Sequence, residues 1–326
     1  MQWERYEKIG MKKYCIGIDI GGTSVKLGVL DHAGRLLKKW EIPTRKGENG
    51  ALLFADIAAE LTAALQALNI AWEEVSGAGM GIPGPVLSDG YVGVCVNLGV
   101  RELYPARELG QLLQGLRVHV ANDANVAALG EMWQGAGKGA RSICMVTLGT
   151  GVGGGIVSEG CIIAGAHGAG GELGHMHVLD GEKEACNCGG HGCLEQYASA
   201  TGIVRVAKCR LAASSADSAM RAFGEALSAK DVCDCAKKGD ALALESLRFS
   251  MEKLGMILGH VALCTDPERF VIGGGVSRAG AFLTELIEQK LREQTPIIRD
   301  ERKRVVLAEL GNDAGIYGAA RMMLEE

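Results

Sequence analysis

Three closely spaced cysteines and a neighbouring set of histidines carry the strongest chemical signal in the sequence. Cys186, Cys188 and Cys193 follow a Cys-X-Cys-X4-Cys spacing with glycines between them, which fits a tight turn that presents three thiolates to one metal ion. The nearby candidates for a fourth, nitrogen ligand are histidines: His167, His175, His177 and His191. Four protein ligands would leave no position for water, so the pattern predicts a structural zinc site rather than a catalytic one. The alternative is a group of free buried thiols.

Acidic and amide side chains near two of the expected elements are candidates for proton transfer and hydroxyl binding. Asn122 and Asp123 follow a short strand, where either residue type commonly caps a helix. An aspartate at such a corner can also accept the proton of an attacking hydroxyl. Glu172 and Glu195 flank the cysteine turn. A carboxylate on the surface is usually only solvated, but a loop anchored by a metal fixes side chains well enough to bind a ligand.

Three glycine-rich turns are candidate nucleotide contacts. The first runs from Asp19 through Gly21 and Gly22 to Lys26, and its aspartate suits hydrated Mg²⁺. The second, 149–155, has five glycines in seven residues, which indicates close approach of the backbone to a ligand. The third, 273–275, follows an expected strand and suits an adenosine. None of them matches the Walker or Rossmann fingerprint, because the second turn lacks the Lys-Ser/Thr pair and precedes a strand.

Apolar patterns in the first part of the chain predict the elements that hold these residues. Residues 14–30 predict a β-hairpin around the first glycine turn, 52–68 a helix and 75–82 a buried strand. A short strand at 118–121 and a helix at 124–133 place Asn122 and Asp123 at a corner.

The later part repeats the strand, turn and strand plan. The expected elements are strands at 143–148 and 156–157 around a turn at 149–155, an irregular stretch at 165–193, helices from 194 to about 264, a strand at 270–272 and a closing helix at 312–325. Two related halves joined near residue 121, with a ligand held between them, are the simplest architecture.

Composition narrows the class of protein. The 48 glycines among 326 residues are about twice the usual share of near 7%. The net charge of −5 gives no general attraction to nucleic acid. The first ten residues are too charged for a signal peptide, and the longest uncharged stretch, 142–158, is too short and too glycine-rich to span a membrane. Eleven cysteines without a signal peptide predict reduced thiols or metal ligation in a cytoplasm rather than a disulfide framework.

Seven motifs, in this order, resemble the ROK family of sugar kinases and sugar-responsive repressors in the actin-like ATPase superfamily. They are DIGGTSVK (19–26), GIPGPV (81–86), NDAN (122–125), GTGVGGGI (149–156), GELGHM (171–176), CNCGGHGCLEQYASATG (186–202) and IGGGVS (272–277). The resemblance covers the chain from about Lys13 onward. The fifth and sixth motifs are most similar to those of the bacterial glucokinases in the family.

The resemblance implies a two-domain α/β fold of ribonuclease-H-like topology with an interdomain cleft. The small domain would be residues 1–121 with a closing helix at 312–326, and the large domain 122–311. Asp123 resembles the general base on the sugar 6-hydroxyl, and His175 matches the zinc ligand beside the three cysteines. The implied sugar ligands are Asn122, Glu172, His175 and Glu195. The implied ATP contacts are Asp19, Gly21, Gly22, Thr23, Lys26, Gly149, Thr150, Gly151, Gly153, Gly273, Gly274 and Gly275.

The implied activity is transfer of a phosphoryl group from ATP, with Mg²⁺, to the 6-hydroxyl of glucose by a homodimer. The same chemistry on N-acetylmannosamine, N-acetylglucosamine, fructose or allose is the alternative, and a sugar sensor without turnover is the next. Only 18 residues precede Asp19, fewer than the helix-turn-helix domain of the family's repressors, so DNA binding is not expected. Met11 is an alternative start of translation.

Overall fold

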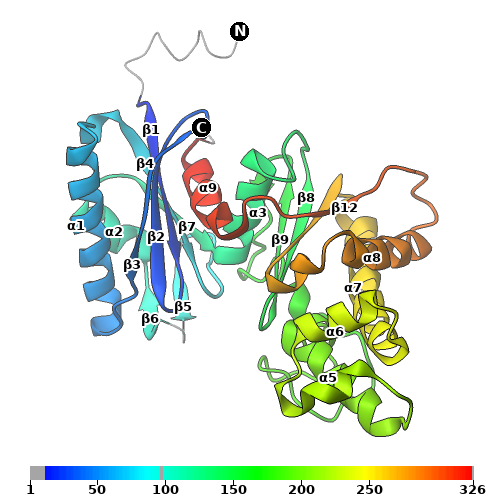
Figure 1. Cartoon of the computed structure of the whole chain (residues 1–326). Coiled ribbons are helices and arrows are strands. Elements are labelled where there is room, and N and C mark those ends of the chain that lie inside the picture. The colour runs from blue at the N-terminus through cyan, green and yellow to red at the C-terminus, as the bar shows by residue number, and fades with distance from the viewer. Residues whose placement is uncertain (1–11, 96–97, 325–326) are drawn as a thin grey trace. The chain divides into compact units, whose positions relative to one another are not determined.

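The computed structural model describes residues 12–95 and 98–324 (Figure 1). The charged first ten residues and Met11 lie outside the described residues. The chain forms two compact units. The first unit comprises Met1–Gly139, Cys161–Gly170 and Asn312–Glu326, and the second comprises Ala140–Gly160 and Gly171–Gly311.

A twisted sheet forms the centre of the first unit. Its strands, in spatial order, are β3 (Leu36–Pro43), β2 (Ser24–Asp31), β1 (Tyr14–Ile20), β4 (Val75–Ile82) and β7 (Val118–Asn122). Strands β1, β2 and β3 are antiparallel neighbours, whereas β1, β4 and β7 are parallel. A small ribbon, β5 (Val92–Cys95) and β6 (Val100–Leu103), forms a separate two-stranded sheet. The short β10 (Cys161–Ile162) is the edge strand of the second five-stranded sheet, described below.

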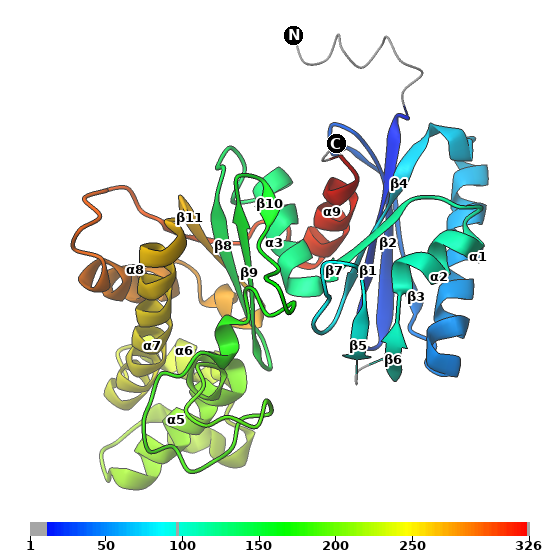
Figure 2. The same ribbon diagram turned by 180° about the vertical axis from the view of Figure 1, so that it is seen from behind.

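Helices cover both faces of this sheet. On one face lie α1 (Ala51–Ala67) and α2 (Pro105–Leu112), and Figure 2 shows them side by side. On the other lie α3 (Asp123–Gln134) and α9 (Ala314–Arg321). The stretch Glu48–Ala67 is the one described helix that is long and apolar enough to cross a membrane by length and composition. Its Phe54, Ile57 and Leu61 are buried in the core of the first unit, as in a core helix.

Glycines allow α9 to lie unusually close to its neighbours. A Cβ atom on Gly79 of β4 would come within 1.7 Å of the Ala319 carbonyl oxygen, and one on Gly318 within 1.7 Å of the Val126 carbonyl oxygen of α3. No side chain fits at such distances, because real Cβ contacts stay beyond about 3 Å. Part of the glycine excess therefore serves packing within the first unit and not ligand binding.

The second unit is built on a sheet with helices at one side. Strands β9 (Val152–Ser158), β8 (Ile143–Leu148), β11 (Arg269–Gly273) and β12 (Val305–Leu307) follow one another across it. Strands β8 and β9 are antiparallel, whereas β8, β11 and β12 are parallel. The helices are α4 (Glu195–Ala198), α5 (Ala200–Ala213), α6 (Ala229–Lys237), α7 (Ala241–Thr265) and α8 (Ala281–Gln294). Strands and helices share one apolar core around Val146, Leu254 and Phe270.

Short 3₁₀ helices connect the larger elements. They are η2 (Glu48–Gly50), η3 (Trp72–Glu74), η4 (Leu173–His175), η5 (Ala219–Ala226), η6 (Gly275–Ala279), η7 (Gly311–Asp313) and η8 (Met322–Leu324).

Two sequence expectations differ from the structure. The turn expected over 149–155 is only 149–151, because β9 begins at Val152 and Gly153 pairs with Thr147 of β8. The division expected near residue 121 also lies elsewhere, since residues 122–139 and 161–170 belong to the first unit. Residues 122–139 belong to the first unit because α3, which lies in this segment, packs against α9. The closing segment, 312–326, belongs to the first unit, and its described part is η7, α9 and η8.

Candidate active site and metal centre

A group of three cysteines and one histidine has the geometry of a zinc site. One ligand atom from each of His175, Cys186, Cys188 and Cys193 lies within 4.8 Å of all the others. The sulfurs of Cys188 and Cys193 are 3.7 Å apart, and the Cys186 sulfur is 3.7 Å from His175 Nδ1. These separations are too long for a disulfide but match the edge of a tetrahedron of about 3.8 Å that zinc–sulfur bonds of about 2.3 Å define. The donor set therefore fits a zinc ion.

Of the four histidines considered, His175 is the one in this group. The His177 ring bonds elsewhere, with Nδ1 at 2.8 Å from the His191 carbonyl oxygen and Nε2 at 2.9 Å from Asp180. The hydrogen bond to the Asp180 carboxylate raises the pKa of His177. His167 belongs to the other unit. Through its contact with the His191 carbonyl oxygen, His177 thus stabilises the cysteine turn.

The two ring nitrogens of His175 face different partners. Nδ1 lies in the cysteine group, and Nε2 lies 3.9 Å from Glu172 Oε2. The 3₁₀ turn η4, which ends at His175, places both side chains on the same segment. Each is only about one-third exposed. A metal on Nδ1 would leave Nε2 to donate to a ligand beside Glu172.

Glu195 lies beside the cysteine group and the second glycine turn at once. Its Oε2 accepts a hydrogen bond of 2.9 Å from the Val152 N–H, and its Oε1 lies 4.0 Å from the Cys186 sulfur. A Cβ on Gly151 would come within 2.3 Å of Glu195 Oε2. The glycine at 151 is therefore what allows the carboxylate to reach the turn.

The start of α5 holds the turn at 149–151 in place. The Gly149 carbonyl accepts from the Ala200 N–H at 2.8 Å, and the Thr150 carbonyl accepts from the Thr201 hydroxyl at 2.9 Å. Ser199 caps α5 by accepting from the Gly202 N–H. The motif 186–202 thus supplies three of the four candidate metal ligands and also the support of the candidate phosphate turn.

The third glycine motif lies next to the second. Strands β8 and β11 are parallel, and Gly273 pairs with Thr147, so the segments that follow them leave the same edge of the sheet. Gly274 has a positive φ of 82°, and a Cβ there would lie 2.5 Å from the Leu148 carbonyl oxygen. Ser277 donates its hydroxyl hydrogen to the Gly274 carbonyl at 2.7 Å. The structure therefore brings the second and third glycine motifs together within the second unit, whereas the first, Asp19 to Lys26, lies in the first unit.

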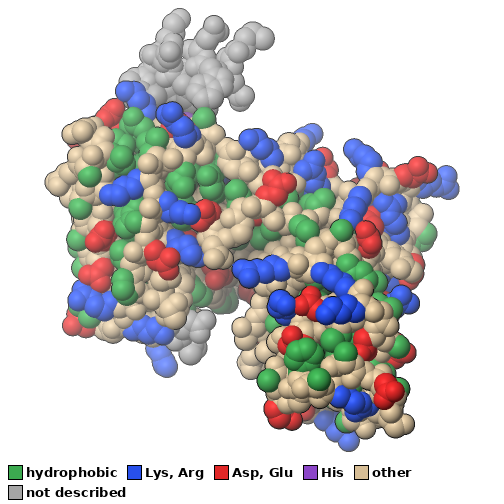
Figure 3. Space-filling view, in the orientation of Figure 1, with side chains coloured by type: hydrophobic (Ala, Val, Ile, Leu, Met, Phe, Trp, Pro, Cys, Tyr) green, Lys and Arg blue, Asp and Glu red, His purple; other side chains and the backbone are tan. Residues whose placement is uncertain are grey.

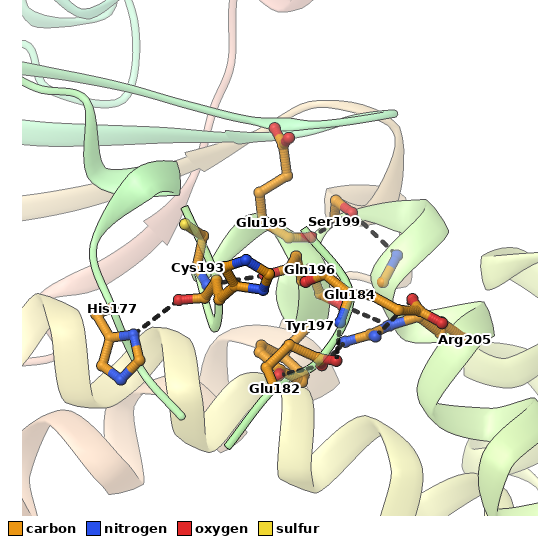
Figure 4. Close-up of polar contacts among 11 residues, drawn as sticks. His177, Glu182, Glu184, Cys193, Glu195, Gln196, Tyr197, Ser199 and Arg205 are labelled. Carbon is orange, nitrogen blue, oxygen red and sulfur yellow. Dashed lines mark hydrogen bonds and ion pairs between the residues drawn. The ribbon is translucent and has the colours of Figure 1, made fainter. Parts of the chain in front are cut away.

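A network around Arg205 fixes the segment that leads into the cysteines (Figure 4). The Arg205 guanidinium pairs with Glu182 at 2.7 Å and with Glu184 at 3.0 Å. The Tyr197 hydroxyl donates to Glu182 at 2.5 Å. These hydrogen bonds, led by the one from Arg205, lower the pKa of Glu182 to about 2. Figure 4 shows the Glu195 side chain pointing away from this network.

In the first unit, the predicted Mg²⁺-facing residue Asp19 is largely buried. Burial raises its pKa, and the Lys26 ammonium at 3.3 Å from Oδ2 acts in the opposite direction. A Cβ on Gly315, at the start of α9, would lie 2.5 Å from the Asp19 carboxyl carbon. Thr44 holds the adjacent turn, because its hydroxyl donates to the Gly21 carbonyl at 2.6 Å and its N–H to the Thr23 carbonyl at 2.9 Å.

At the corner between β7 and α3, Asn122 and not Asp123 is the helix cap. Its Oδ1 accepts from the N–H groups of Ala124 and Asn125 at 3.0 and 3.1 Å, and its Nδ2 donates to the Gly84 carbonyl at 3.2 Å. Asn122 is 8% exposed. Asp123 is the first residue of α3 and is half-buried. Asp123 Oδ1 also accepts the Ala124 N–H, at 2.8 Å, so its carboxylate lies at the helix N-terminus, where a negative charge is stabilised.

Several supporting residues could not be predicted from the sequence. Arg205, Glu182 and Thr44 lie in segments without a recognisable motif, and ion pairs between residues 20 or more positions apart have no signature in a single sequence. Tyr197 and Ser199 lie within the sixth motif, but their partners became evident only from the fold.

We compared the chain with known protein families and with known proteins. The sequence profile of the ROK family matches residues 15–326. A glucokinase from Halalkalibacterium halodurans is 40% identical and covers 96% of both chains. An N-acetyl-D-glucosamine kinase from Salmonella paratyphi A is 32% identical and covers 95% of this chain and 99% of that protein.

A similar solved structure is a ROK family glucokinase from Streptomyces griseus in complex with glucose and AMPPNP. It has a TM-score of 0.71 and 33% identity, and the match covers 96% of this chain and all of that one. The α/β fold of the actin-like ATPase type expected from the motifs is confirmed by this similarity. The family expected from them is confirmed as well, and the chain belongs to the ROK family.

Proposed function

We propose that the protein is a glucokinase, which transfers the γ-phosphoryl group of ATP to the 6-hydroxyl of glucose. The observation that carries this proposal is the position of Glu195. One carboxylate contacts the Val152 N–H of the glycine turn and lies 4.0 Å from Cys186 of the metal group. A sugar-binding carboxylate next to a phosphate turn is what phosphoryl transfer to a sugar needs, because the reaction depends on positioning.

In this proposal the sugar is bound by side chains that have fixed partners in the structure. Glu172 and Glu195 accept hydrogen bonds from sugar hydroxyls, and His175 Nε2 donates one. Asn122 supplies the remaining hydrogen of its Nδ2. The cap on α3 and the metal group limit the freedom of these side chains, so little entropy is lost when the sugar binds.

Asp123 is the proposed general base. Its carboxylate takes the proton of the 6-hydroxyl as that oxygen attacks the γ-phosphorus, and the bond between the γ-phosphorus and the β,γ-bridging oxygen breaks. The products are glucose 6-phosphate and ADP. The turns at 21–23 and 149–151, with Lys26 and Gly153, are proposed to contact the phosphates, and 273–275 the adenosine.

Two metal ions complete the proposal. His175 Nδ1 and the sulfurs of Cys186, Cys188 and Cys193 would hold a structural zinc ion, which fixes the His175 ring. Asp19 would face hydrated Mg²⁺, and the buried carboxylate with a single neighbouring ammonium suits a second cation. Mg²⁺ supplies charge neutralisation of the phosphates.

The test is a kinetic panel that measures ADP release with glucose, mannose, N-acetylglucosamine, N-acetylmannosamine, fructose and allose. Glucose should give the highest kcat/KM. A higher value with an N-acetyl sugar would favour the second candidate, which the N-acetyl-D-glucosamine kinase relative supports. No turnover with any sugar, together with measurable sugar binding, would instead indicate a sugar sensor. A homodimer and a cytoplasmic location remain predictions, which size-exclusion chromatography with light scattering and cell fractionation test.

A further inference from the structure

Two successive carbonyl groups of the turn at 149–151 are directed at the start of α5. The Gly149 carbonyl accepts from the Ala200 N–H at 2.8 Å, and the Thr150 carbonyl accepts from the Thr201 hydroxyl at 2.9 Å. The described peptide bonds are all trans, and the N–H of a planar trans peptide points opposite to its C=O. The N–H groups of Thr150 and Gly151 therefore both point away from α5.

These two N–H groups are free to bind a ligand. Neither donates a hydrogen bond to another residue that the structure describes. The N–H groups on either side are occupied, since Gly149 donates to the Gly151 carbonyl at 3.0 Å and Val152 donates to Glu195 Oε2 at 2.9 Å. Thr150 is exposed and Gly151 is half-buried. Successive backbone N–H groups that face one side form a binding site for an anion.

The chain near this turn offers a phosphate no basic side chain. Residues 142–158 contain no Lys or Arg. On the face of the second unit that Figure 3 shows, Lys and Arg side chains lie among Asp and Glu side chains, so that face is not uniformly basic. The backbone N–H groups are therefore the donors that the turn itself can offer.

The two carbonyl groups are held in different ways. The bond from Ala200 to Gly149 joins backbone to backbone, so no single side chain can remove it. The bond to the Thr150 carbonyl comes from the Thr201 side chain. The peptide that this bond holds ends at Gly151, and glycine allows a peptide to rotate more easily than other residues do. The direction of the Gly151 N–H thus depends on the Thr201 hydroxyl.

The Thr201 hydroxyl is itself fixed by Ser199. Ser199 is fully buried, and its hydroxyl oxygen accepts from the Gly202 N–H at 3.0 Å and lies 2.9 Å from Thr201 Oγ1. Thr201 lies in the first turn of α5, which Ser199 caps. The group that holds the Thr150 carbonyl is therefore in place before any ligand binds.

We propose that Thr201 is a positioning residue for the nucleotide phosphates, a role that rests on the proposed function. Its hydroxyl keeps the peptide between Thr150 and Gly151 in the orientation in which both free N–H groups face one phosphate group. Thr201 does not touch the nucleotide. Without the hydroxyl this peptide has to be ordered when the nucleotide binds, and that ordering lowers the affinity.

The test is calorimetric titration of the wild type, Thr201→Val and Thr201→Ser with AMPPNP in the presence of Mg²⁺, and with adenosine. Valine has nearly the shape of threonine but no hydroxyl. The Kd for AMPPNP should rise between about threefold and tenfold in Thr201→Val, the range of one neutral hydrogen bond, and serine should restore it. The Kd for adenosine should be the same in all three proteins, because adenosine carries no phosphate.

A matched control and the melting temperature separate positioning from a general loss of structure. Thr265→Val removes a hydroxyl that bonds to the Val261 carbonyl on α7 of the same unit, and it should leave the Kd for AMPPNP unchanged. Thr201 is exposed, so its variants should keep the melting temperature of the wild type.

Equal affinity of the wild type and Thr201→Val for AMPPNP overturns the proposal, and so does an equal loss of affinity for AMPPNP and adenosine. AMPPNP binding with the expected differences but without sugar turnover would contradict the proposed function alone. Absence of AMPPNP binding by the wild type would overturn both.

Discussion

The Glu195 carboxylate occupies the space that a side chain at Gly151 would need. A Cβ on Gly151 would lie 2.3 Å from Glu195 Oε2, which accepts the Val152 N–H at 2.9 Å. The glycine therefore couples the candidate phosphate turn to a candidate sugar ligand. The sequence alone indicated only that this glycine allows close approach of the backbone to a ligand.

Replacing Gly151 should therefore affect both substrates. In Gly151→Val the new side chain displaces the Glu195 carboxylate and breaks its hydrogen bond to Val152. Loss of a hydrogen bond to a charged group lowers an affinity about tenfold or more. The KM for glucose and the KM for ATP should therefore both rise. Folding should be largely kept. Steady-state kinetics with each substrate varied in turn measure this.

Gly149→Ala is the matched comparison. A Cβ there meets no atom within 4 Å, so Glu195 keeps its place and the KM for glucose should stay near the wild-type value. An unchanged KM for both substrates in Gly151→Val would show that the displaced carboxylate has no part in binding.

Replacing a cysteine of the metal group should remove zinc. Cys188→Ser leaves three ligands and should lower both the bound zinc and the melting temperature, because binding energy of a structural metal contributes to folding. Elemental analysis of the purified protein gives the ratio of zinc to chain. Cys209→Ser, an exposed cysteine outside the group, is the control and should keep its metal. Equal zinc content in the two variants would rule out this set of ligands.

Asn122 should show separable roles in stability and in sugar binding. Asn122→Ala removes the cap on α3 and should cost about 1 kcal/mol of folding free energy, measured by urea unfolding. Asn122→Ser keeps a capping oxygen and should recover most of that stability. If Asn122 also binds the sugar, the serine variant should retain a raised KM for glucose. Recovery of both properties together would limit Asn122 to capping.

Stability at acid pH should depend on Glu182. Its pKa is about 2 in the folded chain against an ordinary value of 4.5, so the unfolded chain binds more protons between these values. The stabilising contribution is complete above about pH 4.5 and is lost as the pH falls toward about 2. Urea unfolding at a series of pH values should show that the free energy of unfolding falls with pH in the wild type. The fall should be smaller in Glu182→Gln.

The control for this pH dependence is Glu225→Gln. Glu225 forms an exposed ion pair with Lys208, and such pairs contribute little to stability. Its unfolding curve should follow the wild type at each pH. If the free energy of unfolding falls with pH equally in Glu182→Gln and in the wild type, Glu182 does not cause the loss of stability at acid pH.

Much of the fold follows from local patterns, and the differences have physical causes. The β1–β2 and β8–β9 hairpins were predictable because apolar runs flank glycine turns. The predicted start of β9 was wrong because Gly153, Gly154 and Gly155 carry no side-chain pattern. Their place in the strand is determined by pairing with β8. Gly154 has to be small, since a Cβ there would lie 2.4 Å from the Gly171 carbonyl oxygen.

In the candidate site, too, residues close together in the sequence were predictable, whereas contacts between distant residues were not. Cys186, Cys188 and Cys193 were predictable as a ligand set because their spacing is local, and His175 was chosen among four histidines through the family resemblance. The Arg205 network was not predictable, since Glu182 and Arg205 are 23 positions apart. The division of the chain near residue 139 was missed because the packing of α3 on α9 joins segments from the middle and the end of the chain.

The central claim is that Asp123 is the base in ATP-dependent phosphorylation of glucose, and the most direct test measures glucose-dependent ADP release by the wild type and by Asp123→Asn. Asparagine keeps the size of the side chain but cannot accept the proton. We predict that kcat falls by at least about 10², the lower end of a general base's contribution, with an unchanged melting temperature. Normal turnover in the folded variant, or no glucose-dependent ADP release by the wild type, would contradict the claim.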